Sequence, residues 1–241
     1  MLERADALSA PLLARAGIVS YRTPELARQC RDSILDPWVE TTIVETGPEW
    51  DDLDATFMPG AGYAGALDWA FRGAETPYLI ALNADTSFPA ESIRPLLALF
   101  ETNPRLALVG PRQVNPAGQI VHAGITKAGD THGGRSFGEP DAGQHRERLL
   151  EVEQVSGSVM ILRREAYDEV GGFSNCPRLY FEDSILALRL RRAGWTVAYS
   201  GLLTFQHRVA ASPQPEGTSR AALAQEGREA WLRELAEPRG R

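Results

Sequence analysis

The architecture follows from one segment, Tyr78-Leu79-Ile80-Ala81-Leu82-Asn83-Ala84-Asp85. Five successive apolar residues are typical of a strand that is buried on both faces of a sheet. The run stops abruptly at the polar pair Asn83 and Asp85. In parallel α/β sheets, ligands bind outside the carboxyl ends of such strands. The segment therefore predicts an α/β fold with Asp85 at the ligand-binding edge of the sheet.

The segments on both sides of this strand repeat one unit, an apolar strand followed by an amphipathic helix. Upstream, residues 16–20 form a short apolar run, and Thr23-Pro24-Glu25 opens a helix with a cap, an early proline and an acid at the positive end of the helix dipole. Residues 39–46 are rich in β-branched residues and alternate like a second strand. This alternation implies a parallel sheet, and it places Ser20-Tyr21, Glu45 and Asp85 on the same edge.

The regular alternation ends after a strand at residues 106–110. We expect the following elements in chain order: a mobile surface loop at 126–148, a strand at 151–163, helices at about 164–171 and 181–193, a last strand at 195–200, a linker at 208–215, and a charged helix at 216–237 with Leu223, Trp231, Leu232 and Leu235 as its apolar stripe. The chain is thus expected to form one domain over residues 1–207, followed by a linker and a helical tail over 208–241.

Composition excludes several classes of protein. A net charge of −7 over 241 residues disfavours a nucleic-acid partner held through its phosphates. Cys30 and Cys176 belong to no C-x-x-C pair, so neither a disulfide framework nor a zinc site is indicated. Glu3 and Arg4 are unlike the start of a signal peptide, and no apolar stretch reaches the length of a membrane span. We therefore expect a cytoplasmic protein without a transmembrane segment.

Asp85 is the first candidate for chemistry. An acid at the ligand edge can hold Mg²⁺ or Mn²⁺, which bind few carboxylates together with phosphate oxygens. The alternative is that Asp85, followed by Thr86 and Ser87, only serves the turn and a helix cap. His207 follows an apolar run, and a lone histidine is more often structural. It would complete a mixed metal site only if Asp85 binds the metal.

Glu182 and Asp183 are two adjacent acids at the expected start of a helix. Two acids at a helix N-terminus are ordinary dipole compensation. Tyr180 and Phe181 precede them, so the two acids follow directly on apolar side chains. Burial beside such side chains raises the pKa of a carboxylate toward the strength of a useful base.

Three glycines, Gly60, Gly62 and Gly65, have the spacing G-x-G-x-x-G. They follow a polar loop instead of the first strand of a βαβ unit, and no ribose-binding acid closes the pattern. This context therefore disfavours a hydride-transfer enzyme. It favours a flexible loop that lets the backbone approach a nucleotide.

Taken together and in this order, the motifs over residues 16–207 resemble the family 2 glycosyltransferases with the GT-A fold, and among these the rhamnosyltransferase-like members. That fold is a Rossmann-like α/β domain with a mixed, mostly parallel central sheet. The segments that carry the resemblance are Ser20-Tyr21-Arg22-Thr23-Pro24-Glu25-Leu26, Val44-Glu45-Thr46-Gly47, Gly62-Tyr63-Ala64-Gly65-Ala66, Leu82-Asn83-Ala84-Asp85-Thr86, Gly157 to Tyr167, Val170-Gly171-Gly172-Phe173, Phe181-Glu182-Asp183 and Arg192-Ala193-Gly194-Trp195.

The resemblance implies an inverting transfer of a sugar from a nucleotide-diphosphate donor, a dTDP- or UDP-sugar such as dTDP-rhamnose, to an acceptor hydroxyl. Asp183 would be the general base, and Glu182 would orient the acceptor or support the base. Asp85 and His207 would hold Mg²⁺ or Mn²⁺ on the diphosphate. The donor-binding residues implied by the resemblance are Ser20, Tyr21, Arg22, Glu45, Gly62, Tyr63, Asn83, Ala84 and Asp85.

Three places depart from the family pattern. At one of them, Pro59 and Gly60 stand where an asparagine is common. Glu45 replaces the usual aspartate that reads the base, and Asp68 stands where an asparagine or arginine often lies near the phosphates. These departures keep open a non-catalytic nucleotide-sugar-binding domain. A sugar-phosphate nucleotidyltransferase has a similar sheet, but it requires glycines after the first strand, which residues 20–24 lack.

The acceptor and the tail remain open at the level of sequence. The acceptor could be a glycan, a lipid-linked sugar or a small molecule. The tail helix could pack on the core, on a second copy in a homodimer, or on the inner membrane as a peripheral contact. Its polar face is not strongly basic, which favours packing within the protein.

Overall fold

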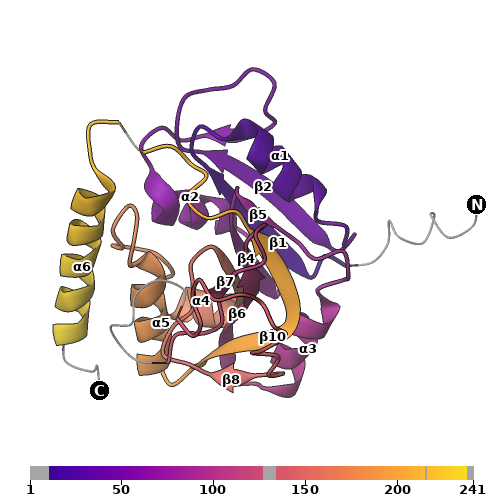
Figure 1. Ribbon diagram of the computed structural model, residues 1–241. Helices are drawn as coiled ribbons and strands as arrows, with labels where there is room; N and C mark the ends of the chain where they lie inside the picture. The colour runs from indigo at the N-terminus through magenta and orange to yellow at the C-terminus, as the bar shows by residue number, and fades with distance from the viewer. Residues whose placement is uncertain (1–10, 127–133, 215, 238–241) are drawn as a thin grey trace, which may run out of the picture.

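The computed structural model describes residues 11–126, 134–214 and 216–237, which form a central sheet with helices on both faces and one outlying helix (Figure 1). The elements are β1 (Ala14–Ser20), α1 (Pro24–Asp32), β2 (Val39–Glu45), β3 (Thr56–Phe57), α2 (Gly62–Phe71), β4 (Tyr78–Asn83), β5 (Thr86–Ser87), α3 (Arg94–Thr102), β6 (Leu106–Val114), β7 (Ile120–His122), β8 (Leu150–Glu151), β9 (Val159–Arg163), α4 (Arg164–Glu169), α5 (Glu182–Arg192), β10 (Thr196–His207) and α6 (Arg220–Ala236).

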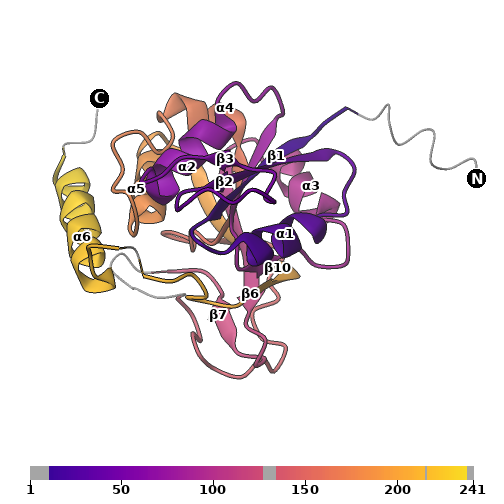
Figure 2. The same cartoon turned by 90° about the horizontal axis from the view of Figure 1, so that it is seen from above.

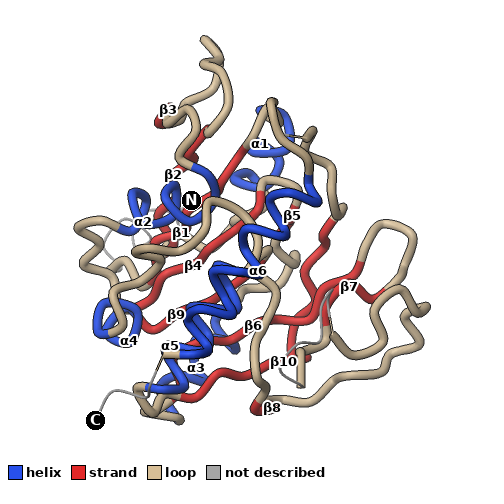
Figure 3. The backbone as a smooth tube through the Cα atoms, turned by 90° about the vertical axis from the view of Figure 1, so that its left-hand side faces the viewer, coloured by secondary structure: helices blue, strands red, loops and turns tan. Residues whose placement is uncertain are grey.

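The sheet has the strand order β3-β2-β1-β4-β9-β6-β10-β5, with β7 beside β6 and β8 beside β10. The long strands β1, β2, β4, β6 and β10 share one direction, and β9 runs antiparallel between β4 and β6. Figure 3 shows these strands as one continuous layer. The predicted α/β class with a mixed, mostly parallel sheet is confirmed.

Helices cover both faces of the sheet (Figure 2). Helices α2, α4 and α5 pack in one apolar core with Leu67, Tyr167 and Leu186, and α1 and α3 pack in the other with Cys30 and Phe100. Apolar residues on both faces explain why the central strands read as continuous apolar runs instead of alternating ones.

The strand register brings the expected residues to one edge. Ser20 at the end of β1 lies opposite Glu45 at the end of β2, and Val19 lies opposite Asn83 at the end of β4. The predicted carboxyl edge, with Asp85 just beyond β4, is therefore confirmed.

The buried residues of α1 have small side chains. The helix buries Ala27 and Cys30, whereas Leu26 is only half-buried and Ile34 lies beyond the end of the helix. The helix begins as expected with Pro24 in its first turn and Glu25 at its positive end, but the predicted cap is wrong, because the Thr23 hydroxyl lies against that of Ser20 at 3.1 Å and makes no capping hydrogen bond.

The single strand predicted at residues 151–163 is wrong. The chain forms β8 and β9, separated by a loop that contains Gly157 and Ser158. A Cβ atom at Gly157 would lie 3.2 Å from the side chain of Asp183, so this position forms a close contact with α5 instead of a ladder pair. Glycine within a strand pattern often marks such an approach.

The last strand is longer than predicted. Strand β10 does not end at Ser200 but continues to His207, with an irregular register between Ser200 and Thr204. Gly201 and the neighbouring leucines interrupt the alternation, which hides the second half of the strand in the sequence. The continuation places His207 opposite Thr86 of β5.

The loop predicted at residues 126–148 is described from residue 134 onward, and residues 127–133 of that loop lie outside the described residues. Arg112 of β6 is fully buried beneath it and pairs with Asp141 at 2.5 Å. The Arg112 guanidinium also donates to the carbonyl of Gln144 at 3.3 Å. Arg135 pairs with Glu147 within the loop at 2.7 Å and donates to the carbonyl of Ala123 at 2.7 Å, so the described part of the loop is attached at two points.

Helix α6 follows the linker and lies beside α5 (Figure 1). Ser219 caps it by accepting the amide of Ala222 at 3.0 Å. Leu232 and Leu235 are 40% and 43% exposed, so their predicted place in the buried stripe is wrong. The buried position is Gly227. Among the described residues, no helix combines the length and the hydropathy that a membrane span needs.

Candidate active site

Asp85 and His207 lie together at the carboxyl edge of the sheet. The Nε2 atom of His207 is 3.3 Å from Oδ1 of Asp85. Both residues are buried, at 9% and 7% exposure. The sequence predicted this pair only as a condition of metal binding, and the fold brings it together through the pairing of β5 with β10.

The second ring nitrogen of His207 is held by Gln113 of β6. Nδ1 of His207 is 3.1 Å from Oε1 of Gln113, and the same oxygen accepts the hydroxyl of Ser158 at 2.7 Å. Because an amide oxygen can only accept, Nδ1 carries the proton in this arrangement. In the neutral ring, Nε2 then carries the lone pair that a metal ion could take up, whereas the protonated ring donates from Nε2 to Asp85.

Asp85 remains a carboxylate at neutral pH. Burial raises its pKa, but the hydrogen bond and charge that a protonated His207 supplies, together with backbone amides, outweigh burial, and the net pKa lies below its ordinary value. The other oxygen, Oδ2, accepts the amide of Ala211 at 3.3 Å.

Asp85 and His207 fit a partial metal site. Within the described parts of the chain, no group of three or more histidine, cysteine or acidic side chains is placed to bind a metal ion. Mg²⁺ and Mn²⁺ commonly take one or two protein ligands and complete their shells with phosphate oxygens and water. A converging imidazole lone pair and carboxylate oxygen are therefore suited to an ion that arrives with a diphosphate.

Glu182 and Asp183 lie in the first turn of α5, as predicted. Oδ2 of Asp183 accepts the amide of Gly157 at 2.8 Å, and Oδ1 accepts the amide of Ser184 at 2.7 Å. Glu182 is buried, and its Oε2 has no hydrogen-bond partner among the described residues.

Burial changes the acidity of both side chains. It raises the pKa of Glu182 to about 8, and the neighbouring charge of Asp183 adds to this effect. Burial also raises the pKa of Asp183, against the lowering by the amides of Gly157 and Ser184. Glu182 is therefore the neutral member of the pair at neutral pH, and Asp183 is the member whose charge is supported by backbone donors.

Gly62 and Tyr63 lie at the start of α2 and reach toward this acidic pair. The hydroxyl of Tyr63 donates to the carbonyl of Gly157 at 2.5 Å, and its amide donates to the carbonyl of Arg178 at 2.7 Å. Gly62 has φ +71°, and a Cβ there would lie 2.5 Å from the Arg178 carbonyl oxygen. Both residues thus pack against the segments of Gly157 and Arg178, which lie next to Asp183 in space and in sequence, respectively.

Glu45 is fully buried and committed to the turn after β1. Its carboxylate accepts the hydroxyl of Ser20 at 2.7 Å, the amide of Arg22 at 3.0 Å and the amide of Gly47 at 2.7 Å. The longer side chain that departs from the family pattern therefore reaches back to hold Ser20-Tyr21-Arg22 in place.

Asp68 of α2, which also departs from the family pattern, is hydrogen-bonded to residues of α4 and of the turn after it. Its Oδ1 accepts the hydroxyl of Tyr167 at 2.5 Å and the amide of Phe173 at 3.1 Å. This carboxylate joins α2 to the turn after α4.

The segment after β10 runs back across the same edge (Figure 1). The amide of Arg208 donates to the carbonyl of Asp85 at 2.9 Å. Farther along, Glu216 pairs with Arg22 at 2.6 Å, and its amide donates to the hydroxyl of Tyr21 at 3.3 Å. Two of the predicted donor-binding residues are thus in contact with the C-terminal segment.

Sequence reasoning missed Gln113, Ser158 and Glu216. The strand that carries Gln113 was predicted to end at Gly110, although β6 continues to Val114. A signal was present, since two polar residues inside an otherwise apolar continuation suggest buried hydrogen bonding. No local signal marks Glu216, because its partner Arg22 is almost two hundred residues away in the chain.

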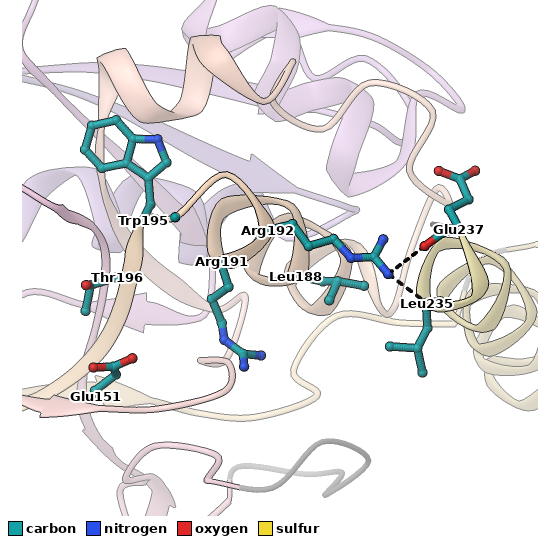
Figure 4. A pocket seen from close by; sticks show the side chains of 9 residues that line it. Glu151, Leu188, Arg191, Arg192, Trp195, Thr196, Leu235 and Glu237 are labelled. Atoms are coloured by element: carbon teal, nitrogen blue, oxygen red, sulfur yellow. Dashed lines mark hydrogen bonds between the residues drawn. The ribbon is translucent and has the colours of Figure 1, made fainter. Parts of the chain in front are cut away.

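A cavity of about 680 Å³ lies elsewhere, between α5, β10 and α6 (Figure 4). Arg191 and Arg192 line it, but Arg191 pairs with Glu153, and Arg192 donates to the carbonyls of Leu235 and Glu237. The carboxylate of Glu153 thus neutralises Arg191, and the N–H groups of Arg192 are taken up by carbonyls of α6 and the residue after it. The candidate active site is therefore the edge with the Asp85–His207 and Glu182–Asp183 pairs, and not this cavity.

The fold and this edge define a class of protein. The structure matches that of GalNAc-T7 with UDP, GalNAc and Mn²⁺ at a TM-score of 0.67 and 12% identity, over 94% of this chain and 48% of that one. It matches the mannosyltransferase PcManGT from Pyrobaculum calidifontis, in complex with GDP-Man and Mn²⁺, at a TM-score of 0.60 and 15% identity, over 97% and 67%. The fold is that of the GT-A glycosyltransferases.

Residues 78–233 match the family described as glycosyl transferase family group 2, and the chain belongs to that family. It is 25% identical over 195 residues to the O-antigen biosynthesis protein RfbC of Myxococcus xanthus, covering 78% of this chain and 15% of the relative. It is 29% identical over 134 residues to an N-acetylglucosaminyl-diphospho-decaprenol L-rhamnosyltransferase of Mycobacterium tuberculosis, covering 51% and 44%. The chain thus spans less than half the length of these relatives.

Proposed function

We propose that this protein is an inverting glycosyltransferase that moves a sugar from a nucleoside-diphosphate donor to an acceptor hydroxyl. The observation that carries the proposal is the placement of two distinct acidic sites beside the nucleotide-binding edge of a GT-A fold. One is the pair of Asp85 and His207, 3.3 Å apart. The other is the pair of Glu182 and Asp183 at the start of α5.

Asp85 and His207 would hold Mg²⁺ or Mn²⁺. When bound, the ion supplies charge stabilisation for the departing nucleoside diphosphate. The turn Ser20-Tyr21-Arg22, fixed by Glu45, is suited to the nucleoside and phosphates, since the ring of Tyr21 and the guanidinium of Arg22 lie together at the same edge.

Asp183 is proposed as the general base. Its carboxylate takes the proton of the acceptor hydroxyl while that oxygen forms a bond to the anomeric carbon from the face opposite the leaving group. The bond from the anomeric carbon to the diphosphate oxygen breaks in the same step, so the configuration inverts. The neutral carboxyl of Glu182 retains a proton that it can donate in a hydrogen bond to the acceptor.

For the donor, we propose a dTDP- or UDP-sugar, with dTDP-rhamnose as the leading candidate. The support is the resemblance of Leu82-Asn83-Ala84-Asp85-Thr86 to the rhamnosyltransferase-like motif, together with the L-rhamnosyltransferase among the curated relatives. That relative's name also specifies a lipid-linked sugar, which makes a lipid-linked glycan the first acceptor to test.

A thermal-shift screen tests the donor and the metal together. A ligand at a hundred times its Kd stabilises the folded protein by about 2.7 kcal/mol. We expect one class of nucleotide sugar to raise Tm only when Mn²⁺ is present, and Asp85→Asn to abolish that shift. A shift that is equal with EDTA and with Mn²⁺ would contradict the metal assignment.

The variant Asp183→Asn separates catalysis from binding. We expect it to bind the donor like the wild type and to lose transfer. Unchanged transfer would overturn Asp183 as the base. Metal-dependent donor binding without transfer by the wild type, over a panel of acceptors, would favour a non-catalytic nucleotide-sugar-binding domain.

A further inference from the structure

The turn that leads into the acidic pair has an unfavourable backbone conformation. Tyr180 and Phe181 have φ of +66° and +67°, so two successive residues with bulky side chains are left-handed. Side chains with a Cβ disfavour this region, and such residues persist only where their surroundings hold them. Glu182 and Asp183 follow at once, so the position of both carboxyls depends on this turn.

Helix α6 packs directly on the turn. Gly227 is buried, and a Cβ atom at this position would overlap the carbonyl oxygen of Tyr180 and lie 3.1 Å from the ring of Phe181. One helical turn later, Trp231 packs its ring against Phe181, with the ring centroids 6.1 Å apart. The absent side chain at Gly227 thus lets the helix backbone touch the turn.

One ion pair and several hydrogen bonds attach the same face of α6 to α5. Arg189 makes two hydrogen bonds to the carboxylate of Glu234, each 2.8 Å long. Arg192 donates to the carbonyl of Glu234 at 2.7 Å and to that of Leu235 at 2.9 Å, the second of which is drawn in Figure 4. Arg189 and Arg192 of α5 are therefore both engaged by α6.

We propose that α6 is a brace that positions the acidic pair, with Gly227 and Trp231 as positioning residues that act through Tyr180 and Phe181. The catalytic part of this inference rests on the proposed role of Asp183. Gly227, Trp231 and Glu234 recur at intervals of four and three residues, so they share one face of the helix. That face contacts the turn and α5, whereas Leu232, beside it in sequence, is 40% exposed.

Trp231→Ala and Leu232→Ala form a matched pair for the test, because they remove neighbouring side chains from the contact face and from the exposed face. Hydrogen exchange on the protein alone is the first readout. We expect Trp231→Ala to speed exchange at the amides of Ser184 and Ile185 and to leave β4 unchanged, since the opening is local. Leu232→Ala and the conservative Trp231→Phe should exchange like the wild type.

Turnover is the second readout, measured as nucleoside diphosphate released from the donor that gives the Mn²⁺-dependent shift. We expect kcat of Trp231→Ala to fall by up to about 100-fold, the loss that a small misplacement of a reacting group can cause, with the donor KM unchanged. The acidic limb of the pH–rate profile should move to lower pH as water reaches the carboxyls. Trp231→Phe should restore both values.

Gly227→Ala provides a second route that does not remove any side chain. Alanine favours a helix interior over glycine, so the helix itself should not be weakened. We expect faster exchange at Ser184 and lower kcat, because the new methyl group displaces α6 from the carbonyl of Tyr180.

Unchanged exchange at Ser184 and Ile185 in both Trp231→Ala and Gly227→Ala would overturn the brace. Equal effects of Leu232→Ala and Trp231→Ala would overturn it as well. Faster exchange in a protein whose wild type transfers no sugar would support the brace and would contradict the proposed function instead.

Discussion

Nε2 of His207 lies 3.3 Å from Oδ1 of Asp85, while Nδ1 of the same ring lies 3.1 Å from Oε1 of Gln113. Both nitrogens of the ring thus have a partner, a carboxylate oxygen at Nε2 and an amide oxygen at Nδ1. Oε1 of Gln113 is itself positioned by the hydroxyl of Ser158 at 2.7 Å. The geometry directs the lone pair of Nε2 to the place where a metal on the diphosphate would lie.

Gln113 is therefore expected to tune metal affinity without touching the metal. Gln113→Leu should weaken Mn²⁺ binding by about 10- to 100-fold, the range for loss of a partner that orients a metal-binding histidine. Gln113→Glu should keep most of the affinity, because its carboxylate also accepts the Nδ1 proton. Titration of Mn²⁺ followed by electron paramagnetic resonance measures both, and equal affinities of the leucine variant and the wild type would contradict this role.

Glu182 should make the protein less stable as the pH rises. The unfolded carboxyl loses its proton near its ordinary pKa of 4.5, whereas the buried group keeps its proton up to about pH 8. Between these values the folded state binds the extra proton, so the free energy of unfolding falls, by up to about 1.4 kcal/mol per pH unit.

Glu182→Gln should remove this slope. The variant is expected to gain most stability over the wild type at about pH 7.5 and least at about pH 5, as measured by urea denaturation at each pH. The conservative exchange leaves the shape of the buried side chain unchanged. A constant difference between the two proteins across this range would show that Glu182 is ionised in the folded state.

Glu216 is expected to compete with the donor for Arg22. The ion pair is 2.6 Å long but exposed, so losing it should cost the free protein little. Glu216→Gln should tighten donor binding up to about fivefold, corresponding to the upper range of an exposed pair. Isothermal titration of the Mn²⁺-dependent donor measures this.

Arg22→Gln should weaken the same binding, and Glu229→Gln on the exposed face of α6 controls for the change in net charge. If Arg22→Gln binds the donor like the wild type, Arg22 does not contribute to the donor site. If the Glu216 and Glu229 variants tighten binding equally, the effect is one of overall charge.

The buried Arg112 predicts an asymmetric response in stability. Asp141→Ala leaves a guanidinium buried without its counter-charge and should cost about 3 kcal/mol. Arg112→Met removes that charge and retains apolar volume, so it should cost less. Denaturant melts of the two variants test this, and a larger loss for the methionine variant would contradict it.

The local part of the fold could be predicted because its signals are local. The apolar run before Asn83 marks a strand buried on both faces, and Thr23-Pro24-Glu25 marks the start of α1. The same reasoning placed Asp85 at the carboxyl edge and Asp183 at the start of α5. The errors fell where backbone and side chains meet distant partners, as at Gly157, which approaches Asp183, and at Gly201, which interrupts β10.

The sequence by itself determined the α/β class, the strand edge that carries Asp85 and the resemblance to family 2 glycosyltransferases, because periodicity and motif order are properties of neighbouring residues. Only the tertiary structure decided which distant side chains meet. It placed His207 beside Asp85, committed Glu45 to the turn after β1, and set Gly227 on the Tyr180 carbonyl. Such contacts depend on how whole elements pack, and packing joins residues between which the sequence carries no periodic signal.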